Sequence, residues 1–281
     1  FYINGAWTAP AAPRDCHVID PSTEDACAVI TLGDQADTDA AVAAALAAFP
    51  SWAATPRAER RAAVVRILEQ YERRFEDLSQ AIAMEMGSPI DHARGSQAPC
   101  LPWHLTNFLT AFDQMEWVRP LGPHAPDTMI SQHPIGVVGL ITPWNWPMNQ
   151  IALKAIPAIL AGCTCVLKPS EESPLDAMLF AEFCHDAGLP AGVFNLVNGL
   201  GPVVGEVLAS HPEVDMVSFT GSTRAGKRVA ALAAESVKRV TLELGGKSAS
   251  VVLPDADMAA AVKGTLSACL LNSGQTCSAH T

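Results

Sequence analysis

The sequence predicts an α/β fold, in which a doubly wound, Rossmann-like parallel sheet follows a set of amino-terminal helices and a short arm. From residue 135 onward, short and nearly continuous apolar runs alternate with capped helical segments, as expected for a parallel sheet buried on both faces. Residues 1–115 instead carry apolar side chains mainly at helical spacing. Two prolines and a glycine at 119–123 separate the two patterns, so we expect a break there.

The composition is typical of a folded protein and excludes several classes of partner. Of the 281 residues, 49% are hydrophobic and 17% are charged, as in ordinary globular chains. The formal net charge of −11 argues against a nucleic-acid surface, because phosphate binding needs clustered Lys and Arg. No apolar run reaches the ~20 residues of a membrane span, and no charged-then-apolar leader opens the chain. We therefore expect a cytoplasmic protein without nucleic-acid or membrane partners.

The spacing of cysteine and histidine predicts neither a disulfide framework nor a metal site. The eight cysteines include no Cys-x-x-Cys pair, and the eight histidines include no His-x-x-x-His pair. Most of the cysteines are expected to be buried thiols that pack as small hydrophobic side chains.

Three helices are expected in the first 115 residues, after a short edge hairpin. The hairpin is predicted from apolar pieces around Gly5 and Pro10, within residues 1–20. The second helix ends where Gly87 and Pro89 cannot continue it. The helices are predicted from a cap at Asp37 or Thr38 to Phe49, over 57–86 and over 101–115.

Alternating strands and helices are expected after residue 135. Ser173 and Pro174 open one helix with a cap and a preset first turn, and Gly188 ends it. The strands are predicted at 135–141, 164–167, 193–197, 214–219, 240–244 and 250–253, and the other helices at 202–210, 223–235 and 258–271. Ligands of such a fold bind beyond the carboxyl ends of the strands.

The turn at 221–227 nearly matches a P-loop. It has the pattern Gly-x-x-x-x-Gly-Lys, but Arg228 stands where a P-loop needs a hydroxyl to hold magnesium. A P-loop ATPase is therefore one hypothesis for this chain, and Arg228 argues against it. The other is a strand-to-helix turn at Gly221 and Ser222 whose amide N–H groups face an anion.

Two further turns leave a structural and a functional interpretation open. Residues 198–205 contain Gly-x-Gly after a predicted strand, but Val204 replaces the third glycine of the dinucleotide fingerprint. The run Lys-Pro-Ser-Glu at 168–171 ends another strand, where a cation and a carboxylate can contact the phosphate and ribose hydroxyls of a cofactor. Both turns are also compatible with ordinary solvated loops.

These motifs, taken in series, resemble those of the aldehyde dehydrogenase superfamily, in its NAD-dependent, non-acylating form. The runs ELGGKS at 243–248 and GQTC at 274–277 look like its glutamate and cysteine signatures, in the same order and spacing. Upstream, the matching segments are TPWNWP at 142–147, Lys154, KPSE at 168–171 and FTGST at 219–223. The resemblance extends over essentially the whole chain.

The resemblance implies oxidation of an aldehyde to a carboxylic acid, through a cysteine thiohemiacetal and a thioester that water hydrolyses. Cys277 is then the nucleophile, as its thiolate. Asn145 and the backbone N–H of Cys277 stabilise the oxyanion. Glu243 is the general base for water, and its presence favours hydrolysis over acyl transfer to coenzyme A. Lys154 assists proton movement.

NAD is the cofactor that the resemblance implies. The diphosphate lies at the helix that begins with Ser222, and Glu171 favours NAD because a carboxylate repels the 2′-phosphate of NADP. The implied cofactor-binding residues are Thr142, Pro143, Trp144, Asn145, Lys168, Ser170, Glu171, Gly201, Phe219, Gly221, Ser222, Leu244 and Gly245.

The resemblance also implies that this chain is the amino-terminal portion of a longer enzyme, without most of the catalytic domain. Residues 1–115 then pack on the cofactor domain, 116–134 form part of an oligomerisation arm, 135–256 bind NAD, and 257–281 start the catalytic domain. The arm predicts a homodimer or homotetramer. The alternative is a truncated nucleotide-binding module without turnover. The aldehyde itself is not identified.

Overall fold

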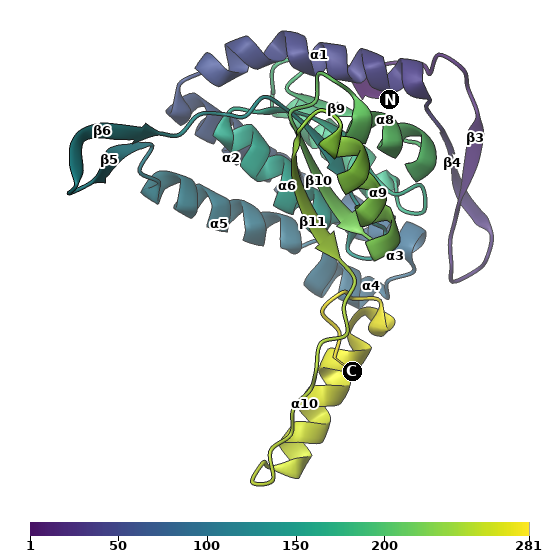
Figure 1. Ribbon diagram of the computed structural model, residues 1–281. Coiled ribbons are helices and arrows are strands. Elements are labelled where there is room, and N and C mark those ends of the chain that lie inside the picture. Colours follow the sequence, from purple (N-terminus) through teal and green to yellow (C-terminus); the bar gives the residue numbers. More distant parts are fainter. Residues whose placement is uncertain (281) are drawn as a thin grey trace.

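The computed structural model describes residues 1–280 and is organised around a seven-stranded sheet (Figure 1). Its strand order is β11-β10-β7-β8-β9-β1-β2. The strands are β1 (Tyr2–Ile3), β2 (Ala6–Trp7), β7 (Val137–Ile141), β8 (Thr164–Lys168), β9 (Phe194–Leu196), β10 (Met216–Gly221) and β11 (Arg239–Leu244). Strands β7 to β11 pair in parallel, whereas β1 and β2 form an antiparallel edge beside β9. The predicted parallel sheet is confirmed.

Crossover helices connect the strands and cover both faces of the sheet, as the doubly wound prediction requires. The chain passes from β7 to β8 and β9 in one direction, and then returns to place β10 on the other side of β7. The crossovers are α6 (Pro147–Ala161), α7 (Leu175–Asp186), η2 (Gly201–Gly205) with α8 (Glu206–Ser210), and α9 (Thr223–Ala234). Because the order reverses between β7 and β10, a binding crevice is expected beyond their carboxyl ends.

Two hydrophobic clusters fill the space between the sheet and its helices. The amino-terminal helices are α1 (Gln35–Ala54), α2 (Arg57–Arg73), α3 (Phe75–Met86), α4 (Ile90–His92), the π-helical η1 (Ala93–Gln97) and α5 (Cys100–Gln114). The larger cluster packs α2, α3, α5, α6 and α7 on one face, and the smaller packs α1, α8 and α9 on the other. In α6, Ile151, Ala155 and Ile159 recur at four-residue spacing and are fully buried, which anchors this helix.

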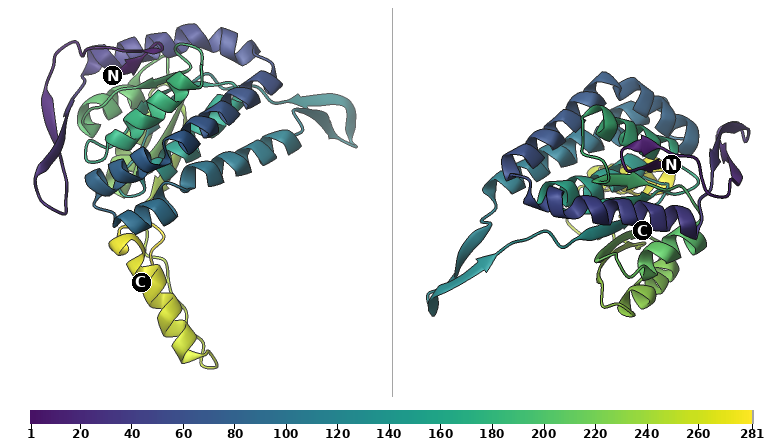
Figure 2. Two further views of the ribbon diagram at one scale, coloured as in Figure 1. Left: turned by 180° about the vertical axis from the view of Figure 1, so that it is seen from behind. Right: turned by 90° about the horizontal axis from the view of Figure 1, so that it is seen from above.

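Three segments project from this body (Figures 1 and 2). They are the hairpin of β3 (Asp15–Ile19) and β4 (Ala26–Thr31), the hairpin of β5 (Val118–Gly122) and β6 (Ala125–Ser131), and helix α10 (Met258–Leu270) with the chain around it. The first hairpin was not predicted. Helix α10 exposes Met258, Val262, Leu266 and Leu270. Within residues 1–280, no helix has both the length and the apolar composition needed to cross a bilayer.

The first long helix begins earlier than predicted. Its cap is Asp34, not Asp37 or Thr38, and it continues beyond Phe49 to Ala54 with Pro50 inside it. The Asp34 carboxylate accepts the N–H of Ala36 at 2.8 Å, and the Asp37 carboxylate accepts the N–H of Asp34 at 3.1 Å. This reciprocal capping satisfies N–H groups that the helix itself leaves free.

The single helix predicted over 57–86 is two helices that meet at Arg74. Arg74 leaves helical geometry, with φ −122° and ψ 27°. Its guanidinium donates to Asp77 at 2.9 Å and also contacts Glu182 on α7. Apolar spacing continues across this position, so the sequence pattern carries no sign of the break.

Two other local predictions are wrong. No strand forms at 250–253, because no strand within residues 1–280 lies beside these residues to satisfy their backbone groups. Ser173 does not cap α7, since its Oγ has no partner within residues 1–280. The N–H groups of Leu175 and Asp176 are instead accepted by the buried carboxylate of Glu85 on α3. A distant side chain therefore replaces the expected local cap.

Candidate active site

The cysteine signature forms a turn with an unusual backbone after α10. The turn η3 (Leu271–Gly274) leads to Cys277, which is exposed. Asn272, Ser273 and Gly274 follow one another with φ values of 54°, 55° and 75°. Left-handed conformations are costly for residues other than glycine and persist where the surroundings hold them. The contacts of this turn therefore decide how Cys277 is presented.

Hydrogen bonds attach this turn to the segment that follows β7. The side-chain Nδ2 of Asn145 donates to the carbonyl of Gln275 at 2.8 Å, and the indole Nε1 of Trp146 donates to Thr276 Oγ1 at 2.9 Å. The Nδ2 of Asn272 returns a hydrogen bond to the carbonyl of Asn145 at 2.8 Å. Segments about 130 positions apart in sequence thus meet in one place.

A cavity of about 290 Å³ lies beside this junction, beyond the carboxyl ends of β7, β10 and β11. Eight predicted site residues line it: Pro143, Trp144, Asn145, Gly221, Ser222, Leu244, Gly245 and Cys277. Sequence reasoning gave no site role to the other lining residues, Gln150, Thr220, Gly246, Gly274, Gln275 and Thr276. Four of these six lie inside the two signatures and Thr220 lies inside the FTGST segment, whereas Gln150 is distinguished only by its position in the fold.

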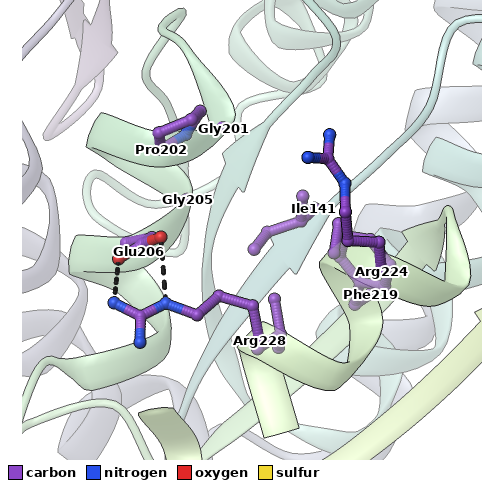
Figure 3. A pocket seen from close by; sticks show the side chains of 10 residues that line it. Ile141, Gly201, Pro202, Gly205, Glu206, Phe219, Arg224 and Arg228 are labelled. Atoms are coloured by element: carbon purple, nitrogen blue, oxygen red, sulfur yellow. Dashed lines mark hydrogen bonds and ion pairs between the residues drawn. The ribbon is translucent and has the colours of Figure 1, made fainter. Parts of the chain in front are cut away.

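A second cavity, of about 320 Å³, lies between η2 with α8 on one side and α9 on the other (Figure 3). Two more predicted residues, Gly201 and Phe219, line it together with Ile141 at the end of β7. Arg228 also lines it and donates two hydrogen bonds to the carboxylate of Glu206 (Figure 3). The cavity therefore occupies the predicted crevice, where the strand order reverses.

Four predicted residues at the ends of β7 and β8 lie outside both cavity linings. Lys168 Nζ and Glu171 Oε2 form an ion pair at 2.9 Å, with the lysine side chain only 5% exposed. Ser170 Oγ accepts the N–H of Glu172 at 3.3 Å, so this serine stabilises the turn after β8. Thr142 is buried, and its N–H donates to the Lys168 carbonyl at 3.1 Å.

Glu243 and Lys154 also lie outside the cavity that Cys277 lines. Glu243 is exposed on β11, one residue before Leu244. Lys154 is buried on α6, and its Nζ donates to Ser218 Oγ on β10 at 3.1 Å. Burial lowers the pKa of Lys154 to about 8, although the charge of Glu243 acts in the opposite direction. The two groups therefore interact electrostatically.

The glycine at 226 has a packing role that accounts for the near match to a P-loop. A Cβ at Gly226 would lie 2.5 Å from Leu244 Cδ2, so glycine allows α9 to approach β11 closely. Arg228, where a P-loop has its magnesium-binding hydroxyl, is paired with Glu206. Residues 1–280 contain no cluster of three or more His, Cys, Asp or Glu side chains placed to hold a metal.

The polar groups around the two cavities fit a dinucleotide. Within residues 1–280, no acceptor meets the N–H groups of Thr223 and Arg224 at the start of α9, where a diphosphate can bind. The buried Oγ1 of Thr220, which lines the first cavity, also has no partner in the described part of the chain. The Lys168–Glu171 pair has the chemistry to hold ribose hydroxyls, and Ile141 and Phe219 offer apolar surface to a flat base.

Residues 7–281 match the sequence model of the aldehyde dehydrogenase family. This chain belongs to that family. It is 47% identical over 280 residues to 3-succinoylsemialdehyde-pyridine dehydrogenase of a Pseudomonas species, covering 99% of this chain and 58% of that protein. A putative aldehyde dehydrogenase of Staphylococcus aureus is 41% identical, with 100% and 58% covered. The chain therefore spans a little over half the length of these relatives.

Solved aldehyde dehydrogenases share the fold closely. The enzyme from Bartonella henselae superposes with a TM-score of 0.98 at 52% identity, covering all of this chain and 59% of that one. A mutant of aldehyde dehydrogenase C from Pseudomonas syringae, solved with NAD+ and octanal, has a TM-score of 0.97 at 51% identity, with 100% and 57% covered. The resemblance expected from the motifs is confirmed over the whole chain.

Proposed function

We propose that the protein containing this chain oxidises an aldehyde to a carboxylic acid, with NAD as hydride acceptor. The observation that carries the proposal is the junction between Asn145 and the Cys277 turn, beside a cavity at the carboxyl ends of the strands. It brings a thiol and an amide donor together at the place where this fold binds dinucleotides. Family membership and relatives solved with NAD+ support the same reaction and cofactor.

In the first step, the thiolate of Cys277 attacks the aldehyde carbonyl carbon. A C–S bond forms and the carbonyl oxygen becomes an oxyanion. One N–H of the Asn145 amide donates to the Gln275 carbonyl, and the second is available for the oxyanion, together with the backbone N–H of Cys277. Donors held in place before the reaction stabilise charge that develops only in the transition state.

Residues at or after the carboxyl ends of five strands, β7 to β11, would hold the cofactor. Lys168, Ser170 and Glu171 would hold the adenosine ribose, and Gly201 and Phe219, which line the second cavity, would border the adenine. Gly221 and Ser222 would hold the diphosphate at the start of α9, and Pro143, Trp144, Leu244 and Gly245, which line the first cavity, would hold the nicotinamide. Thr142 is buried next to Pro143, outside that lining, and would support this segment. A bound NAD would supply the hydride acceptor for this oxidation, and as the carbonyl re-forms, the carbon attached to Cys277 becomes a thioester carbon.

Glu243 and Lys154 serve the second half of the reaction. The carboxylate of Glu243 removes a proton from water, the water oxygen attacks the thioester carbon, and the C–S bond breaks to release the acid and the Cys277 thiolate. Lys154 helps the proton to leave Glu243, since the two groups influence each other electrostatically. Because Glu243 is exposed, we propose that further chain packs against β11 in the active enzyme.

The β5–β6 hairpin is proposed to be the oligomerisation arm of a homodimer or homotetramer. It exposes Val118, Leu121 and Met129, and apolar side chains on a projecting hairpin favour contact with another subunit. We keep the segments 1–115, 116–134, 135–256 and 257–281 as the proposed division into hairpin and helices, arm, NAD-binding domain and start of the catalytic domain.

One observation favours a second candidate, a nucleotide-binding module without turnover. Neither Glu243 nor Lys154 lines the cavity that contains Cys277. Such a module binds NAD but produces no NADH when an aldehyde is added. Measuring NAD binding by calorimetry, and NADH production across a panel of aldehydes, on the same purified protein separates the two functions and also identifies the aldehyde class.

Glu243→Gln tests the proposed roles of Cys277 and Glu243 together. The amide cannot accept a proton from water, so the first burst of NADH is expected to remain while steady-state turnover falls by about 100-fold or more. Stopped-flow absorbance at 340 nm, a wavelength at which NADH absorbs, measures both phases. Glu235→Gln at the end of α9 is the matched control and should leave both phases unchanged. An unchanged steady-state rate in Glu243→Gln contradicts the assignment.

A further inference from the structure

Gln97 is a fully buried polar side chain that neither the sequence motifs nor the cavity linings assign to the site. It ends the π-helical turn η1, and π-helical turns occur frequently at functional sites. Its Nε2 donates to the backbone carbonyl of Asn145 at 3.2 Å and to Asn272 Oδ1 at 3.0 Å. It also lies 3.4 Å from the sulfur of Met86. Gln97 therefore contacts both segments that meet at the active site.

The orientation of the Gln97 amide follows from its two oxygen neighbours. The carbonyl of Asn145 and Oδ1 of Asn272 are both acceptors, so only a donor lowers the energy between them. The reversed amide would place Oε1 against two oxygens. In the observed orientation Oε1 is buried and has no partner within residues 1–280. An apolar side chain would avoid that desolvation cost. The presence of an amide therefore indicates that its N–H donors are needed for the hydrogen bonds to Asn145 and Asn272.

Asn272 completes the same network from the cysteine turn. Its Nδ2 donates to the carbonyls of Asn145 at 2.8 Å and Gln275 at 3.2 Å, while its Oδ1 accepts from Gln97. Asn272 also begins the left-handed run at 272–274. Surrounding contacts must hold such a run, and Gln97 supplies one of them from a third segment of the chain.

We propose that Gln97 is a positioning residue that holds the Cys277 turn at a set distance from Asn145. The proposal rests on the proposed function, because that function requires the thiol and the Asn145 amide to act on one carbonyl group. A displacement of about 1 Å between reacting groups can lower a rate by about 100-fold. The contribution of Gln97 is therefore expected in kcat, while NAD binding at α9 stays unchanged.

Gln97→Met is the first test, because methionine has a similar length and no N–H donor. We expect kcat to fall by about tenfold and the rate of Cys277 alkylation by iodoacetamide to change by about threefold or more. The dissociation constant of NAD should stay within about twofold of the unaltered protein. Gln114→Met, at an exposed position on α5, is the matched control and should change none of the three.

Gln97→Glu distinguishes positioning from a general packing role. Its carboxyl group donates a hydrogen bond only when protonated, so its kcat relative to that of the unaltered protein should rise as the pH is lowered. Gln97→Met should show no such recovery. A loss of packing alone would lower the melting temperature of both variants and give neither of them a pH-dependent recovery.

The outcomes separate this proposal from the proposed function. If the unaltered protein makes no NADH from any aldehyde, the proposed function fails, and the alkylation rate at Cys277, mapped by mass spectrometry, still tests the positioning. If Gln97→Met keeps both kcat and the alkylation rate while the Gln114→Met control behaves as expected, Gln97 does not position the turn. A fall in NAD affinity equal to the fall in kcat also overturns the proposal.

Discussion

Lys154 illustrates how the fold changes the chemistry of one residue. An exposed lysine is charged at every physiological pH, but the burial of Lys154 on α6 lowers its pKa to about 8. Its Nζ donates a hydrogen bond to Ser218 on β10. A lysine that titrates near neutrality can both accept and release protons, as the proposed relay from Glu243 requires.

Lys154→Met is expected to change the pH dependence of turnover. The neutral amine predominates above its pKa, so kcat of the unaltered enzyme should rise as the pH increases through about 8. Methionine cannot titrate, so this rise should disappear and kcat should be lower by about tenfold or more. Steady-state rates between pH 6 and 10 measure the effect, with exposed Lys263→Met as control. A rise near pH 8 that persists in Lys154→Met excludes this role.

Glu171 is expected to determine the choice between NAD and NADP. The unaltered enzyme should prefer NAD, because the carboxylate paired with Lys168 repels a 2′-phosphate. In Glu171→Gln that repulsion is absent, and the ratio of kcat/KM for NAD to that for NADP should fall by about tenfold. Glu172→Gln is the neighbouring control. A preference of the unaltered enzyme for NADP would falsify this prediction.

At the scale of elements, the strand ends and helix starts assemble the site. Parallel pairing aligns the carboxyl ends of β7, β10 and β11, so the residues that follow them meet along one edge. Periodicity predicted the five parallel strands, β7 to β11, to within about two residues at each end. It did not predict the break at Arg74, because a single residue with non-helical angles leaves the apolar spacing intact.

The cap of α1 provides a prediction about stability. Asp34→Ala removes the carboxylate that accepts the N–H groups of Ala36 and Asp37, and it should lower the free energy of unfolding by about 1 kcal/mol. Asp34→Asn retains an oxygen acceptor and should lose less than half of that amount. Urea unfolding followed by circular dichroism compares the two. Equal losses in both variants would mean that capping is not the cause.

At the scale of the whole molecule, a buried pair of carboxyl groups couples α3 to α7. Glu85 on α3 accepts the N–H groups at the start of α7, and Asp176 on that turn is equally buried. Burial raises the pKa of Asp176 to about 7 and, together with the charge of Asp176, raises the pKa of Glu85 well above its usual range. Two carboxylates so close cannot both ionise readily.

The raised pKa values of Asp176 and Glu85 predict how the free energy of unfolding depends on pH. Between about pH 4 and pH 7 the folded state retains a proton that the unfolded chain has released, so the free energy of unfolding should fall as the pH rises. Asp176→Asn should reduce this fall and be more stable than the unaltered protein at pH 8. Urea unfolding at pH 5 and pH 8, with exposed Asp186→Asn as control, measures the difference. A steeper fall in Asp176→Asn would contradict it.

The sequence by itself determined the fold class, the family and the residue types that carry the chemistry. Apolar runs and glycine turns are local patterns, and the signatures at 243–248 and 274–277 are enough to specify the proposed base and nucleophile. Only the tertiary structure decided which side chains support them. Gln97, Asn272 and Glu85 act across long separations in the chain. Their hydrogen bonds exist only after folding brings distant segments together, and no local pattern records such pairings.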